Sequence, residues 1–97
     1  MSDGPAKIRP WRESPFTRGK HYRVRQSFAA LRDSFIAGDV LIFDSDAWSR
    51  SEGITGYFFR QGGREALRVW DIDDDADLDI WRELFEELSD TLTPNDP

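Results

Sequence analysis

The stretch ITGYFFRQGGREALRVWDI, residues 54–72, gives the strongest indication of the fold. It contains two runs rich in β-branched and aromatic residues, which favour strands. Between them stand Gly62 and Gly63, and glycine readily adopts the positive backbone φ that a tight turn requires. We therefore predict a β-hairpin over this stretch.

Two further strands are predicted upstream of the hairpin. In KHYRVRQSF, Tyr22 and Val24 alternate with basic residues, which is the period of a half-buried strand. In FIAGDVLIF, the turn-forming pair Gly38 and Asp39 precedes a short apolar run typical of a strand. Because these strands follow one another through short turns, we predict a small antiparallel barrel or curled sheet of four or five strands.

An amphipathic helix is predicted after the last strand. That strand carries apolar residues on both faces, Leu67 and Val69 on one and Trp70 and Ile72 on the other, so a further element must cover the second face. The segment that follows repeats apolar residues at i, i+3, i+7 and i+10, namely Leu78, Trp81, Phe85 and Leu88. The expected core is the following set: Tyr22, Val24, Phe28, Phe35, Val40, Ile42, Phe58, Leu67, Val69, Trp81, Phe85 and Leu88.

Length and composition bound the class of protein. The chain has 97 residues, 38% of them hydrophobic, which is enough for one small domain with a single core. The absence of cysteine excludes disulfide scaffolds, cysteine-ligated zinc and thiol nucleophiles. No apolar run resembles a signal peptide or a membrane span, so we expect a cytoplasmic protein. We expect a poorly ordered segment over residues 1–15, the folded domain over 16–90 and a disordered tail over 91–97.

Charge is segregated along the chain. Residues 1–33 carry eight Lys or Arg against three Asp or Glu, whereas residues 71–97 carry one against eleven. We expect part of the acidic field to meet the basic face of the first strand at Arg23 and Arg25, and the rest to face water. Asp75 or Asp77 is expected to cap the predicted helix, because an aspartate oxygen accepts from the free N–H groups of the first turn.

The aspartates from 71 to 79 also follow the odd-numbered ligand spacing of a calcium loop. However, Ala76 stands where the sharp turn requires glycine, and Arg82 stands where a bidentate glutamate is required. We therefore expect no specific metal site, and no cofactor. His21 is the only histidine and has no local nucleophile pattern, and nothing near Asp44 and Asp46 indicates a pocket that would shift their pKa values. We expect no enzyme.

Binding remains as the expected function. A basic and aromatic mixture near the N-terminus is typical of proteins that bind single strands, but a pI near 4.6 argues against nucleic acid. Trp48 lies in a polar stretch and serves either as an anchor for a partner or as a lid on the sheet. The candidate partner-binding residues are Trp48, Asp73, Asp74, Asp79, Glu83, Glu86 and Glu87.

Two functional hypotheses stay open on these residues. The first is a non-enzymatic protein-interaction module that presents an acidic helix face to a partner with a basic surface. The second is an acidic inhibitor or immunity-type protein that imitates nucleic acid or blocks a basic active site. A homodimer formed through a sheet edge or through Trp48 is a further option.

The motifs in GKHYRVRQSF, SFIAGDVLIF and EGITGYFF resemble an uncharacterised family of small, mostly bacterial SH3-like domains of unknown function. The matching positions are Gly19, Tyr22, Val24, Phe28, Phe35, Gly38, Phe43 and Gly53. The resemblance covers residues 18–89 and implies an SH3-like barrel with a closing helix. It implies no activity, because such barrels carry many unrelated functions.

Overall fold

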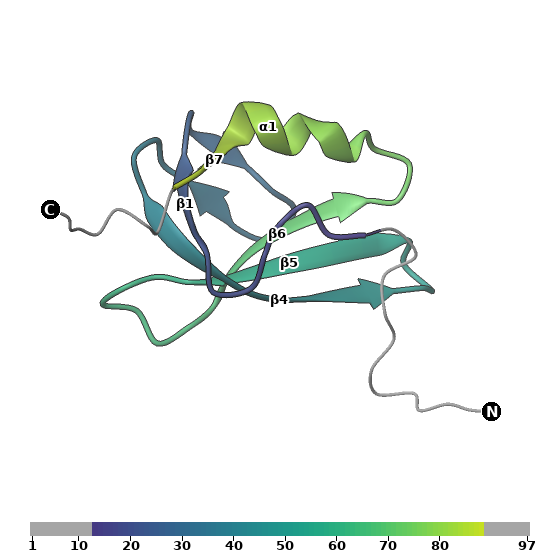
Figure 1. Ribbon diagram of the computed structural model, residues 1–97. Helices are drawn as coiled ribbons and strands as arrows, with labels where there is room; N and C mark the ends of the chain where they lie inside the picture. The colour runs from purple at the N-terminus through teal and green to yellow at the C-terminus, as the bar shows by residue number, and fades with distance from the viewer. Residues whose placement is uncertain (1–12, 89–97) are drawn as a thin grey trace, which may run out of the picture.

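A computed structural model describes residues 13–88, and the chain before and after them lies outside the described residues, including most of the predicted lead-in and all of the predicted tail. The domain is mainly β, with a five-stranded antiparallel sheet, a separate two-stranded hairpin and one short C-terminal helix (Figure 1). The strands are β1 (His21–Val24), β2 (Phe28–Ala29), β3 (Ser34–Phe35), β4 (Val40–Ser49), β5 (Ile54–Arg60), β6 (Arg68–Asp73) and β7 (Phe85–Glu87). A 3₁₀ turn, η2 (Leu78–Ile80), leads into α1 (Trp81–Leu84).

The large sheet has the order β6-β5-β4-β1-β7, so the last strand returns to pair with the first. The small hairpin pairs β2 with β3. The predicted antiparallel β architecture is confirmed. Within residues 13–88 no ladder joins β6 to β7, so the pairings do not close the sheet into a barrel.

The hairpin predicted over residues 54–72 is present. Strands β5 and β6 pair antiparallel, with Tyr57 opposite Trp70, and the connection between them includes Gly63 at φ +83°. Glycine tolerates this left-handed backbone conformation because it has no Cβ to clash with the following carbonyl. The feature that first indicated the fold therefore forms one side of the large sheet, with β6 as an edge strand.

The predicted inward face was wrong on two strands. Val40 is 41% exposed, whereas Leu41 is fully buried beside Tyr22, its cross-strand partner on β1. Leu67 is exposed as well, and the inward residues of β6 are Trp70 and Ile72. An unbroken apolar run does not reveal its inward face, and a shift by one residue exchanges the two faces of a strand. The cross-strand pairing of Leu41 with the buried Tyr22 fixes which face of β4 points into the core.

The rest of the predicted core divides between confirmed and half-buried positions. Tyr22, Val24, Phe35 and Phe85 are buried as predicted. Phe28 and Trp81 are half-buried but pack against the core. The remaining half-buried positions are Ile42, Phe58, Val69 and Leu88.

Phe16 lies at the centre of the core, although it precedes the first strand. Its ring is 5% exposed. The rings of Tyr22, Phe43, Tyr57, Phe59, Trp70, Trp81 and Phe85 lie around it, with centroids 5.1 to 5.9 Å away. Most of these contacts are edge to face, the geometry that aromatic quadrupoles favour.

The long C-terminal helix predicted over residues 78–88 was wrong. Helix α1 ends at Leu84, and at Phe85 the backbone turns to φ −131° and ψ 150°, which is extended. Strand β7 then pairs with the free edge of β1, so its N–H and C=O groups complete a ladder that a helix would leave unmade. The predicted aspartate cap is confirmed, because Asp77 accepts from the N–H of Asp79 at 3.0 Å. Within the described residues no helix is long and apolar enough to span a membrane.

Candidate functional site

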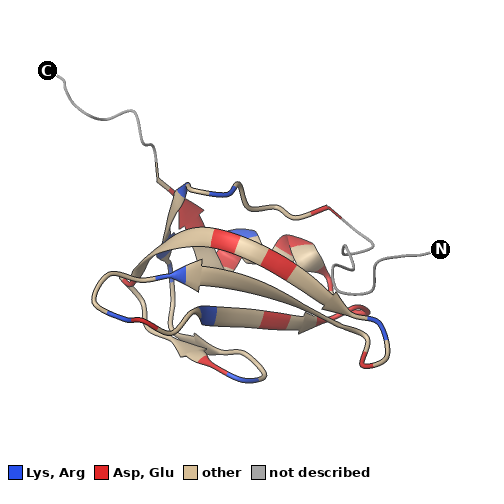
Figure 2. Ribbon diagram, turned by 90° about the horizontal axis from the view of Figure 1, so that it is seen from below, with Lys and Arg blue, Asp and Glu red and all other residues tan. Residues whose placement is uncertain are grey.

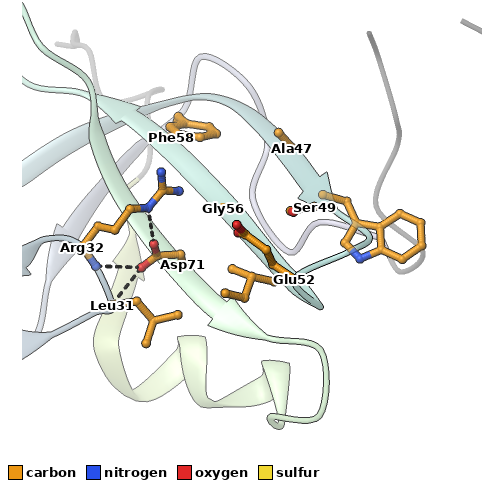
Figure 3. A pocket seen from close by; sticks show the side chains of 10 residues that line it. Leu31, Arg32, Ala47, Ser49, Glu52, Gly56, Phe58 and Asp71 are labelled. Carbon is orange, nitrogen blue, oxygen red and sulfur yellow. Dashed lines mark hydrogen bonds and ion pairs between the residues drawn. The ribbon is translucent and has the colours of Figure 1, made fainter. Parts of the chain in front are cut away.

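A groove of about 660 Å³ lies on the side of β4, β5 and β6 that faces away from the aromatic core (Figure 3). Its floor is made of small residues, because Ala47 on β4 stands opposite Gly56 on β5. Ile54 and Phe58 lie two residues to either side of Gly56, on the same face of β5, and form the two ends of the floor. The groove exists because the residues facing outward here are small.

Because Gly56 has no side chain, Phe58 and Arg32 can pack over it and bound the groove on that side. A Cβ at this position would lie 3.2 Å from the ring of Phe58 and 3.4 Å from a terminal nitrogen of Arg32. Glycine therefore lets both side chains approach the floor. Besides Trp48, an isolated glycine inside a predicted strand was a signal of this site in the sequence, because it often marks a close approach to the backbone.

Asp71 on β6 holds the turn between β2 and β3 beside the groove. Its side chain is 1% exposed. One carboxylate oxygen accepts from the backbone N–H groups of Leu31 and Arg32 at 2.8 and 3.2 Å, and the other accepts from Nε of Arg32 at 2.6 Å (Figure 3). A buried carboxylate needs such partners, so these bonds fix the turn against β6.

A second ion pair holds the same turn from its other side. Arg68 on β6 is 4% exposed at its side chain and donates from Nε to Asp33 at 3.1 Å, with an ion-pair distance of 3.7 Å to Asp39. It also donates to the side chain of Gln61 at 2.6 Å and to the carbonyl of Ser34. Its guanidinium lies 4.6 Å from the centroid of the Phe35 ring.

In the two ion pairs the β2–β3 turn and β6 each supply one cation and one anion. Adjacent residues of the turn, Arg32 and Asp33, meet Asp71 and Arg68 on β6. Burial raises the pKa of the Asp33 carboxyl, but the hydrogen bonds from Arg68, Val69 and Ser34 outweigh burial, so this pKa lies below its usual value of 3.8. The turn is therefore held against β6 by two ion pairs of opposite polarity.

Trp48 lines the end of the groove next to the β4–β5 turn and is half-buried. Its ring nitrogen donates to Asp74 at 2.9 Å, and Thr55 donates to the same carboxylate at 3.4 Å. The backbone N–H of Asp74 in turn donates to the carbonyl of Gly53 at 2.8 Å. Asp74, which the sequence placed on a binding surface, therefore ties the β4–β5 turn to the end of β6 and orients Trp48.

The remaining predicted acidic residues separate into two groups. Glu86 and Glu87 lie on β7 and form ion pairs across to β1, with Arg23 at 3.4 Å and with Lys20 at 3.3 Å. The expected meeting of the acidic field with Arg23 is thus confirmed, through Glu86. The other group, which we call the acidic rim, consists of the exposed carboxylates of the segment from the end of β6 to α1: Asp73, Asp75, Asp77, Asp79 and Glu83.

The acidic rim lies beside the end of the groove at the β4–β5 turn. The bond from Asp74 to Gly53 brings the segment that carries the rim against the β4–β5 turn, where Glu52 is also exposed. Figure 2 shows acidic residues at this end of the sheet and around the C-terminal helix, and the β4–β5 turn also carries the exposed Arg50. Among residues 13–88, Asp75, Asp79 and Glu83 make no ion pair with Lys or Arg. In the same residues no group of three acidic or histidine side chains is placed to share a metal ion.

Comparisons with known proteins show the fold and no family. No protein-family model matches the chain, and no curated protein matches it. Among solved structures, the domain resembles the integron cassette protein VCH_CASS4 from the mobile metagenome of Vibrio cholerae. The TM-score is 0.63 at 21% sequence identity, over 76% of this chain and 87% of that chain. At this identity the likeness establishes a shared β fold alone.

Proposed function

We propose that this protein is a non-enzymatic protein-interaction module of the SH3-like class, and that its acidic rim attracts a partner with a basic surface. The order of elements supports the class. A first strand is followed by a short hairpin, a three-stranded meander, a 3₁₀ turn and a last strand that returns to the first. The resemblance found in the sequence implies the same class.

The observation that carries the proposed function is the outward and mainly negative character of the acidic rim, in whose segment Arg82 is the single cation. Asp75, Asp79 and Glu83 are exposed and have no cation of residues 13–88 paired with them. A cluster of like charges that is not neutralised locally raises the concentration of oppositely charged partners near it and speeds their association. Glu86 and Glu87 lack this capacity, because Arg23 and Lys20 balance them.

The use of the buried charged groups also supports binding over catalysis. Asp71 and Arg68 are buried and both bind the β2–β3 turn, and Arg68 also binds Gln61 and Asp39. A catalytic acid or base needs to reach a substrate. These two side chains instead hold the wall of an open groove in place.

A matched pair of variants tests the proposed function. The double variant Asp79→Asn, Glu83→Gln neutralises two carboxylates of the acidic rim, and Glu86→Gln, Glu87→Gln neutralises two paired carboxylates as the control. We expect the rim variant to associate with a partner that has a basic surface about tenfold more slowly than the wild type at low salt. The association rate of the control should stay within about twofold of the wild type. The measurement is the association rate by stopped flow at two salt concentrations. Equal rates for both variants would refute a role for the rim.

A further inference from the structure

We propose that the groove is a second contact site of this module, and that it binds an extended peptide segment of the partner. The segment carries an apolar side chain over Ala47, a carboxylate facing Arg32 and a basic residue facing Glu52. This inference rests on the proposed function, because it names the part of the partner that follows the first electrostatic contact. It also adds residues that the acidic rim does not include.

The shape of the floor fits an extended chain. The floor runs along β5 from Ile54 to Phe58, a distance of about 13 Å at a rise of about 3.3 Å per residue, which is the length of about four extended residues. Phe58 and Arg32 cover Gly56, so the room for one apolar side chain lies over the exposed Ala47 beside it. Leu31, which is exposed on the β2–β3 turn, forms the lip above it.

Arg32 supplies a positioned cation on one side of the groove. Its side chain is 62% exposed, although Nε is held by Asp71 at 2.6 Å. Holding Nε fixes the plane of the guanidinium, and one terminal nitrogen lies over Gly56. A planar guanidinium with N–H groups still available binds a carboxylate through parallel hydrogen bonds.

Glu52 supplies the opposite charge across the groove. It lies in the β4–β5 turn, is exposed and lines the groove, and in Figure 3 it extends toward Gly56 from the side opposite Arg32. It makes no ion pair with Lys or Arg of residues 13–88. The groove therefore presents a cation and an anion on either side of an apolar floor, which complements a segment whose acidic and basic residues flank an apolar one.

Capped synthetic peptides that differ only in their two charged positions test the inference. Each has a central leucine flanked by alanines, with Asp and Lys at the two outer positions in either order, or with two Asp or two Lys. Binding is followed by amide chemical shifts of the isotope-labelled protein. We expect at least one mixed-charge peptide to shift the amides of Leu31, Ala47 and Gly56, with an affinity at least threefold tighter than that of either like-charge peptide.

Two substitutions and one control then assign the site. Ala47→Tyr fills the floor at an exposed strand position that tolerates an aromatic residue, and we expect it to abolish the shifts. Ala66→Tyr, in the β5–β6 turn at the far end of the sheet, should leave binding within about twofold. Glu52→Lys should change the preference from a mixed-charge peptide to the peptide with two Asp.

The outcomes separate this inference from the proposed function. Unchanged binding by Ala47→Tyr, or absence of shifts with all four peptides, would overturn the groove as a peptide site. Shifts that depend on protein concentration without peptide would assign the groove to a second copy of the chain and also overturn it. The rim variant Asp79→Asn, Glu83→Gln should bind the mixed-charge peptide within about twofold, so a failure of the rim leaves this test intact.

Discussion

Replacing Arg68 with methionine should destabilise the domain by about 3 kcal/mol, because removing one partner of a buried ion pair costs about 3–5 kcal/mol. Methionine preserves much of the side-chain volume but none of the donors. Asp33, Asp39 and the carbonyl of Ser34 would each lose a charged partner. We expect the lower end of that range, because the two carboxylates are 23% and 24% exposed and water can solvate them in part.

Urea denaturation measures this cost. With a slope of about 1 kcal/mol per molar, typical of a small domain, the unfolding midpoint should fall by about 3 M with no change in slope. Arg64→Met, at an exposed position of the β5–β6 turn, is the control and should change stability by less than about 0.5 kcal/mol.

A double-mutant cycle with Asp33→Asn isolates the pair. The double variant should be more stable than the sum of the single effects predicts, by at least about 1 kcal/mol, because each single change leaves the other group without its partner. A cost of Arg68→Met below about 1 kcal/mol, or strictly additive effects, would refute the reasoning that this guanidinium holds the β2–β3 turn.

Three further outcomes are expected. Because the pKa of Asp33 is lowered in the folded state, the stability that its charge contributes is fully present above the ordinary pKa of 3.8 and is lost as the pH falls through the lower folded pKa. In thermal unfolding from pH 2 to 6, the melting temperatures of the wild type and of Asp33→Asn should converge only at the acid end. Asp71→Ala should lower the free energy of unfolding by about 2–4 kcal/mol, since it leaves the N–H groups of Leu31 and Arg32 without an acceptor. It should also broaden the amide signals of the β2–β3 turn, and unchanged signals would contradict the role of Asp71 in holding that turn. Added millimolar calcium should raise the melting temperature no more than magnesium does, and a calcium-only increase would reverse the conclusion drawn from Arg82.

The sequence predicted the inward face correctly for strands in which apolar and charged residues alternate. Tyr22 and Val24 alternate with charged residues, so their inward direction follows from the pattern. The hairpin of β5 and β6 follows from two β-rich runs and a glycine turn. The inward face of VLIF does not, because all four residues are apolar and either register buries two of them.

The candidate site was predicted less completely than the fold. Trp48 and the acidic segment could be noticed because they contrast with their neighbours in sequence. The turn that carries Leu31 and Arg32 could not be joined to Gly56, because the contact depends on which residues of β6 face outward. Glu86 and Glu87 looked like the rest of the acidic field until β7 placed them opposite cations of β1.

The sequence by itself determined a single antiparallel β domain, because strand-length apolar runs separated by turn residues leave few other ways to bury a core in so short a chain. It also determined the excess of negative charge toward the C-terminus. Only the tertiary structure decided that residues 85–87 form a strand and not the end of a helix. The physical reason is that the free edge of β1 needs a partner for its backbone N–H and C=O groups, and this need outweighs the helical spacing of four apolar side chains.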